Sequence, residues 1–219
     1  MKRLALLPLL LAGCGTSGAG PSDAPSEEIV YATSFSTDPT LLRPGQFGIY
    51  SVTVSGQASS FTTTMKVTGE DAEGLWIEQK VPANPNPFII KTHISRKGEL
   101  LESWAGEPRS PAPALVYDHT KGGPPPKSAE AADVKVEVTR ETITVAGRRY
   151  DCTKLISTIT YKNGKVSNLT DWCSMEAPFP LMKDGKPVGG VVRRQYGKVM
   201  VELHSMGDNG REELVIPKK

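Results

Sequence analysis

The sequence predicts a mainly β fold, a curved antiparallel meander of half-barrel shape with few short helices, for which a β-sandwich is the alternative. Two observations lead to this prediction. Short runs rich in Val, Ile, Thr and aromatic residues recur along the chain with turn residues between them, which is typical of strands. No stretch keeps a helical apolar period for longer than about two turns.

The N-terminal half is expected to contribute four strands. Each run is bounded by turn residues, among them the pairs Ser55-Gly56 and Lys97-Gly98. Such pairs tolerate the backbone conformations of tight turns, so they indicate hairpins between neighbouring antiparallel strands. The expected strands are residues 47–55, 60–68, 75–81 and 88–95.

A proline-rich segment at residues 107–132 separates the two β-rich halves. The chain has 18 prolines, and this segment includes the run Pro124-Pro125-Pro126. We expect a long loop here, either a linker between subdomains or a loop across the mouth of a barrel. Any short helices are expected within residues 100–132.

The C-terminal half begins with a clear alternation, because Val134, Val136 and Val138 are separated by polar residues. This pattern predicts a half-buried strand. Further along, Asn163-Gly164 predicts a two-residue hairpin turn, and in that register the numbers of opposed residues sum to 327.

This register places Cys152 and Cys173 on one face of the hairpin, one diagonal step apart. Exported proteins usually pair their cysteines, so we expect a disulfide, with a bulge or a slipped turn to bring the two residues closer. Two buried thiols are one alternative, and a redox or metal pair is another. The same register places Leu155, Ile159 and Trp172 on the opposite face, where they are expected to be core residues.

The N-terminus carries a targeting pattern. A basic start at residues 1–3 and an apolar run at 4–11 precede Leu11-Ala12-Gly13-Cys14. The apolar run is much shorter than the ~20 residues that span a bilayer, so residues 1–13 are interpreted as a cleaved signal peptide. An ordinary secretory signal with a coincidental cysteine is the alternative. Residues 14–28, rich in Gly, Ser, Ala and Pro, are expected to be a flexible tether to a single β-rich domain at 29–219.

The last four residues of this pattern resemble the lipobox of bacterial lipoproteins. The resemblance implies that Cys14 becomes a lipid-modified N-terminus that anchors the chain through acyl chains such as palmitate. Because Gly15 rather than Asp follows the cysteine, it also implies the outer membrane, facing the periplasm, as the location.

Composition and motifs argue against several functions. With 26 basic and 24 acidic residues the net charge is +2, which argues against a dedicated nucleic-acid binder. No G-x-S-x-G, H-E-x-x-H, EF-hand or P-loop motif is present, and His93, His119 and His204 have no Cys, Asp or Glu at ligand spacing. We therefore expect no catalytic residues, no metal and no cofactor, and an envelope hydrolase is the least favoured hypothesis.

The C-terminal part resembles the LolA/LolB-type periplasmic half-barrel proteins. The resemblance rests on the runs at residues 145–152, 172–174, 178–183, 191–194 and 199–207. It implies a curved sheet whose concave face holds acyl chains. The candidate ligand-binding residues that it implies are Leu155, Ile159, Trp172, Val199, Val201 and Leu203.

Two functional hypotheses follow. The first is a lipid-anchored, non-enzymatic envelope lipoprotein that binds an apolar or lipid-like ligand. The alternative is a structural or assembly lipoprotein that binds a protein partner through its sheet edge or its proline-rich loop.

Overall fold

A computed structural model describes residues 32–33, 37–58, 60–81, 86–121 and 131–217 of the chain. The predicted signal peptide, the lipidation site Cys14 and the tether lie outside these residues. So do residues 122–130 of the proline-rich segment.

The described residues are mainly β, as predicted. Apart from the helical residues Ala32 and Thr33, their helices are two 3-10 turns, η1 (Pro39–Leu41) and η2 (His119–Lys121). Among them no helix is long and apolar enough to cross a membrane. The strands are β1 (Phe47–Val54), β2 (Ser60–Glu70), β3 (Gly74–Val81), β4 (Phe88–Ser95), β5 (Leu100–Gly106), β6 (Ala114–Asp118), β7 (Ala131–Val145), β8 (Arg148–Tyr161), β9 (Val166–Ser174), β10 (Pro180–Lys183), β11 (Lys186–Tyr196) and β12 (Val199–Gly207).

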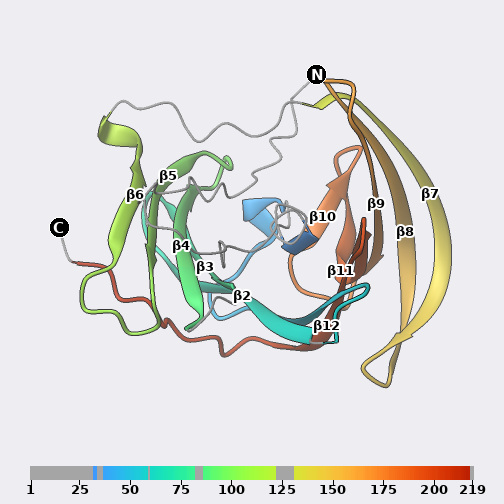
Figure 1. The fold of residues 1–219 in the computed structure, drawn as a ribbon. Coiled ribbons are helices and arrows are strands. Elements are labelled where there is room, and N and C mark those ends of the chain that lie inside the picture. Colours follow the sequence, from blue (N-terminus) through green and yellow to red (C-terminus); the bar gives the residue numbers. More distant parts are fainter. Residues whose placement is uncertain (1–31, 34–36, 59, 82–85, 122–130, 218–219) are drawn as a thin grey trace.

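All twelve strands belong to one antiparallel sheet in the order β6-β5-β4-β3-β2-β1-β12-β11-β9-β8-β7, with β10 paired to β11. This confirms the meander and excludes the β-sandwich alternative for the described residues. The sheet consists of two runs of sequential strands that meet where β1 pairs with β12. It is curved and open, and its two ends rise as facing walls (Figure 1).

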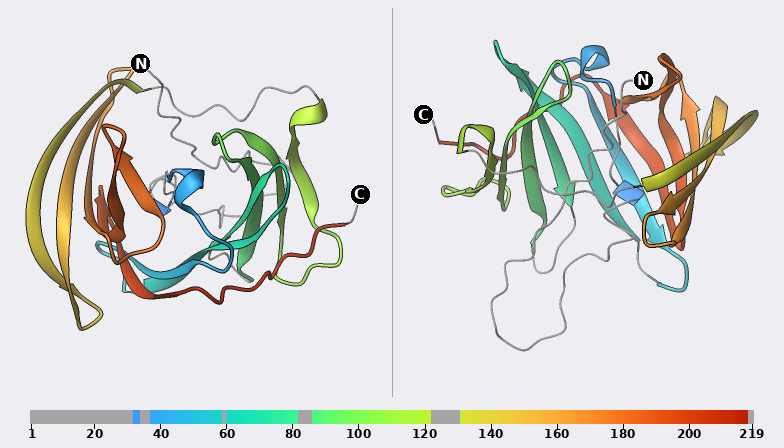
Figure 2. Two further views of the ribbon diagram at one scale, coloured as in Figure 1. Left: turned by 180° about the vertical axis from the view of Figure 1, so that it is seen from behind. Right: turned by 90° about the horizontal axis from the view of Figure 1, so that it is seen from above.

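The concave side of the sheet holds much of the core. The η1 turn and β10 lie inside the curve in both views from the ends of the strands (Figures 1 and 2). Leu42, which follows η1, packs with Phe179 and with concave residues of β2 to β4. A larger cluster joins β1, β11 and β12 through Val52, Val192 and Val201, each with no measurable exposure.

The proline-rich segment is not a continuous loop, which corrects the prediction for residues 107–132. Residues Ala114–Asp118 form β6, which pairs with β5 and is one edge of the sheet. Residues 114–118 include Val116 and Tyr117, which favour strands, and contain no proline. Pro111 and Pro113 precede this stretch, so its backbone donors remain available for pairing.

The predicted register of the β8–β9 hairpin is wrong by one residue. The turn has three residues, since Gly164 N–H donates to Tyr161 O and Tyr161 N–H donates to Lys165 O. Gly164 adopts a positive φ of 80°, which closes a three-residue hairpin loop with a bulge. Paired residues such as Thr160 and Val166 therefore sum to 326 rather than 327.

A one-residue shift moves side chains to the other face of a strand. Thr153, not Lys154, is opposite Cys173, so Cys152 and Cys173 point to opposite faces of the sheet. Both cysteines are buried and free in the structure. The predicted disulfide is therefore absent, and of the interpretations weighed above, two buried thiols describe the fold.

Candidate functional site

The candidate ligand-binding residues of the concave face are core residues. Val199, Val201 and Leu203 have at most 1% exposure and pack against β1. Leu155 and Ile159 share this face but lie on β8, across β9 and β11 from the other three. Their side chains contribute to the packing of the sheet rather than to a described cavity.

Trp172 does not join this set. It is opposite Lys154 on β8 and Arg193 on β11, and therefore lies on the outer face. Lys154 Nζ and Arg193 Cζ lie 4.9 and 5.8 Å from its ring centroid, and its Nε1 donates to Glu141 Oε2 at 3.0 Å. Lys154 also donates to this carboxyl and, with Trp172, holds the pKa of Glu141 below its usual range.

The concave face instead contains a buried ion pair between Asp171 on β9 and Arg194 on β11. Arg194 Nε is 2.6 Å from Asp171 Oδ1, and a second guanidinium nitrogen is 3.1 Å from Oδ2. Both side chains are 5% exposed. Leu155 is opposite Asp171 and Val201 is opposite Arg194, so the pair lies within an apolar row.

The outer face of β2 to β4 carries three buried charges in a row. Lys66 is opposite Glu78, and Glu78 is opposite Lys91, so the three side chains are adjacent on one face. Each residue is at most 4% exposed. Lys66 Nζ is 3.1 Å from a Glu78 carboxylate oxygen, and Lys91 Nζ is 3.9 Å from the other.

Residues 209–217, which we call the C-terminal strap, cover this row. The strap follows β12 and runs along the outer side of β2 to β5 (Figure 1). Glu213 N–H and Leu214 N–H both donate to the Glu78 carboxylate, at 3.0 Å to its nearer oxygens. Lys91 donates to Leu214 O at 3.0 Å and also pairs with Glu212. The buried Glu78 carboxylate thus accepts hydrogen bonds from two backbone N–H groups of a segment that belongs to no strand.

Glu213 links the strap to two lysines of the sheet. Its carboxylate oxygens are 2.7 Å from Lys66 Nζ and 2.9 Å from Lys80 Nζ. Partial burial raises the pKa of Glu213, but the hydrogen bonds and charges of these lysines outweigh it and hold the pKa below its usual range. Burial lowers the pKa of Lys91, and the charge of Glu78 opposes that shift.

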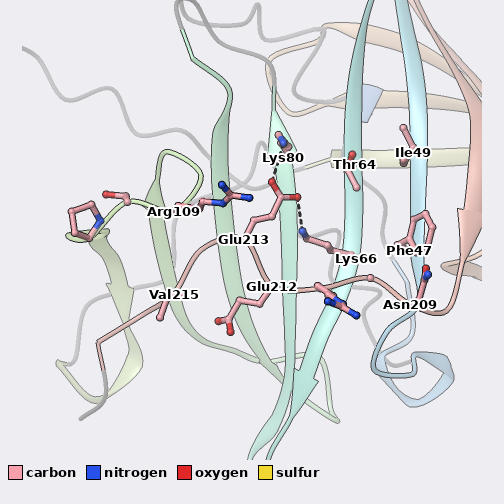
Figure 3. A pocket seen from close by; sticks show the side chains of 14 residues that line it. Phe47, Ile49, Thr64, Lys66, Lys80, Arg109, Asn209, Glu212, Glu213 and Val215 are labelled. Carbon is pink, nitrogen blue, oxygen red and sulfur yellow. Dashed lines mark hydrogen bonds and ion pairs between the residues drawn. The ribbon is translucent and has the colours of Figure 1, made fainter.

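A groove of about 800 Å³ lies beside the strap on the outer face, over β1 to β3 (Figure 3). Phe47 and Ile49 of β1 supply apolar surface, and Val215 of the strap lies farther along the groove. Within the part of the chain that the structure describes, the side chains of Arg109 and Arg211 form no ion pair. The groove is lined by Phe47, Ile49, Thr64, Lys66, Lys80, Arg109, Ser110, Pro111, Asn209, Gly210, Arg211, Glu212, Glu213 and Val215.

This arrangement suits an amphiphilic ligand that carries an anionic group. Aliphatic or aromatic parts of a ligand can cover Phe47 and Ile49, while unpaired guanidinium groups can bind a carboxylate or phosphate. Volumes of about 300–1,000 Å³ are typical of small-molecule sites.

Sequence reasoning missed this groove and a second polar cluster near it. At the start of the β2–β3 turn, Asp71 accepts from Trp76 Nε1 at 2.9 Å and lies 3.1 Å from His93 Nε2. The Trp76 and His93 rings are stacked with centroids 4.3 Å apart.

The sequence signal that could have indicated the outer-face charges was a set of charged residues, Lys66, Glu78 and Lys91, inside runs otherwise typical of strands. In the described residues no group of three or more His, Cys, Asp or Glu side chains is placed to hold a metal ion.

Comparisons with known proteins add little to this geometry. No protein-family model matches the chain, and no curated protein matches it. One similar solved structure is that of a DUF1329 family protein from Desulfovibrio piger. It is 14% identical, the alignment covers 78% of this chain and 86% of that chain, and the TM-score is 0.27.

Proposed function

We propose that this chain is a lipid-anchored, non-enzymatic lipoprotein of the cell envelope that binds a lipid-like amphiphile with an anionic group in the outer-face groove. The anchoring rests on the lipobox-like residues that end at Cys14, and Gly15 in place of Asp after that cysteine supports an outer-membrane location facing the periplasm. The observation that carries ligand binding is the groove itself, because it combines an apolar floor with two arginines, Arg109 and Arg211, that form no ion pair with another described residue.

The ligand would lie with its apolar chain along β1. Phe47 is opposite Lys66, and Ile49 is opposite Thr64, so the apolar pair and the cationic wall belong to neighbouring strands. Lys66 and Lys80 are already paired with Glu213. The anionic group of a ligand would therefore bind Arg109 and Arg211.

The test compares oleate with uncharged oleyl alcohol, using the full chain and a fluorescence displacement assay. Replacing both arginines, in Arg109→Ala with Arg211→Ala, should weaken oleate binding by about thirtyfold, since each of the two charge-assisted hydrogen bonds contributes about 1 kcal/mol. Binding of oleyl alcohol should change less than twofold. Arg43→Ala removes the same charge at an exposed site outside the groove and is the matched control.

A second variant tests the apolar part of the site. Ile49→Asp should weaken both probes, because a charged side chain would then lie in the floor of the groove. Failure of both probes to bind the parent chain would overturn ligand binding, and an equal loss with Arg43→Ala would show that oleate binds by non-specific charge attraction.

Binding of a protein partner is the second candidate function. It is supported by β7, a long strand at the sheet edge that the described residues leave unpaired on one side. An open strand edge can accept a strand from another chain. Crosslinking in cells from exposed β7 positions separates the two candidates, since a carrier is expected to show only transient protein contacts.

A further inference from the structure

The outer edge of β7 is an exposed strand surface. Among the described residues β7 pairs only with β8, through fourteen residue pairs from Ala131 to Val145. It forms the outermost part of one wall of the sheet (Figure 1). Val134 and Val138 are 44% and 52% exposed, although they are opposite the buried residues Ile159 and Leu155.

The sequence of β7 is complementary to itself when it is reversed. Val134, Val136 and Val138 occupy the concave face, and Asp133, Lys135 and Glu137 alternate with them on the outer face. About Val136 as a centre, the valines are symmetric and Lys135 mirrors Glu137. Natural edge strands often carry charges that prevent pairing, but here one register turns these charges into attractions.

We propose that two copies of this chain pair antiparallel through β7 about a two-fold axis at Val136. In that arrangement Val136 is opposite Val136 of the second copy. Val134 of each copy is opposite Val138 of the other, and Lys135 of each copy is opposite Glu137 of the other. Directly opposed residues share a face, so the two concave faces become continuous and the exposed valines are covered.

Neighbouring registers are less favourable. Directly opposed residues lie on the same face of the sheet, and successive residues of a strand alternate between faces. The numbers of two opposed residues must therefore both be even or both be odd, so that the two-fold axis passes between a residue and its own copy. An axis at Lys135 would oppose Lys135 to itself and Asp133 to Glu137. An axis at Glu137 would oppose Glu137 to itself and Asp133 to Glu141. These like-charge pairs are destabilising. Axes at Val134 or Val138 also give attractive pairs, Asp133 with Lys135 or Lys135 with Glu141. The axis at Val136 is favoured over these two because it alone opposes all three valines to valines.

Cysteine crosslinking on the full chain tests the register. Residues opposed in an antiparallel pair have Cα atoms about 4.5–5.5 Å apart, within the range of a disulfide. With Cys14→Ser in every variant and in the parent, Val136→Cys should therefore give a disulfide-linked dimer under mild oxidation. The Cys14→Ser parent, whose remaining Cys152 and Cys173 are buried, should not.

Two more positions serve as matched controls. Thr139→Cys and Asp133→Cys should not crosslink alone, because each lies about 20 Å from its own copy across the axis. An equal mixture of these two variants should crosslink, since residue 139 is opposite residue 133. Crosslinking of Thr139→Cys alone as efficient as that of Val136→Cys would overturn the register.

Charge exchange tests the pairing without cysteines. Sedimentation of Lys135→Glu should show dimerisation weakened by about tenfold, because two like-charge pairs replace two attractive ones. The double variant with Glu137→Lys should restore it. A parent chain that stays monomeric at about 100 μM, or a double variant no better than the single one, would overturn the proposal.

Discussion

At the scale of single residues, Glu78 is the centre of the outer-face charges. Its carboxylate is surrounded by Lys66, Lys91 and the N–H groups of Glu213 and Leu214. A buried charge is tolerated only when partners replace its hydration. Replacing one of these charged residues should therefore lower the free energy of unfolding by more than the net contribution of its ion pair, since the remaining buried charges are left without a partner.

Glu78→Gln should lower the free energy of unfolding by about 3 kcal/mol, as expected when one partner of a buried ion pair is removed. The neutral amide leaves two buried lysines facing each other and loses acceptor strength toward the strap. Urea unfolding followed by tryptophan fluorescence measures the loss. Glu73→Gln, at an exposed position in the β2–β3 turn, is the control, and an equal effect there would contradict the assignment.

The two mature-domain cysteines give a second prediction at this scale. Burial raises the pKa of Cys152 to about 11 and also raises that of Cys173, so both thiols are poor nucleophiles at neutral pH. Alkylation of the native protein should be slow at both residues. Mass spectrometry after unfolding without reductant should find both modified, and a linked Cys152–Cys173 peptide would refute this.

At the scale of elements, the strap is a segment without strand partners that is nevertheless well anchored. Arg109 N–H donates to Glu213 O, and Gly210 N–H donates to Gly45 O. Leu214 is fully buried and lies where Gly106 leaves room, since a Cβ on that glycine would be 3.2 Å from Leu214 Cδ1.

Leu214→Ala should destabilise the protein by about 3 kcal/mol, because it removes a large buried side chain. Hydrogen exchange should show faster exchange at the strap amides of Glu213 and Leu214. The adjacent Val215→Ala, at a 64% exposed residue, should change stability by less than about 0.5 kcal/mol. Equal effects of the two variants would mean that the strap is not packed as described.

The strap should also respond to acid through Glu213. The pKa of Glu213 in the folded protein lies below its ordinary value of 4.5, so the group stabilises the fold above that value. This stabilisation is lost as the pH falls through 4.5 and then through the lowered pKa.

Glu213→Gln should therefore flatten the decline of the unfolding free energy between about pH 6 and 3. Urea titrations at several pH values measure the slope. Glu99→Gln, at an exposed turn position, should leave the slope of the parent chain unchanged, and a parent-like slope in Glu213→Gln would contradict the role of this carboxyl.

The strands and the site differ in how far the sequence predicts them. The expected strand at residues 88–95 coincides with β4, and that at 75–81 lacks only Gly74 of β3, because an alternating pattern is a local property. The β8–β9 register failed because Asn163-Gly164 is part of a three-residue turn. The groove was missed because Phe47, Lys66 and Glu213 meet only through non-local strand pairing and the path of the strap.

At the scale of the whole molecule, two meanders depend on one junction. The pairing of β1 with β12 joins the strands β1–β6 to the strands β7–β12, and the strap crosses from the second meander onto the first. Val52 and Val201 are opposite each other at this junction and are fully buried. Residues so distant in sequence must meet before either wall has its full set of neighbours, so folding is expected to be slow.

If the β1–β12 junction joins the two meanders into one cooperative unit, a substitution that weakens its packing should lower the stability of both meanders. Val52→Ala should lower the free energy of unfolding by about 2 kcal/mol through lost burial and an unfilled volume. Native-state hydrogen exchange should show this loss equally at amides of β3 and β4 and at amides of β8 and β9, because each wall opens only by global unfolding. Thr53→Ala, on the exposed face of the same strand, should change neither wall by more than about 0.5 kcal/mol. Faster exchange confined to one wall would show instead that the two meanders unfold separately, with the strap unable to couple them.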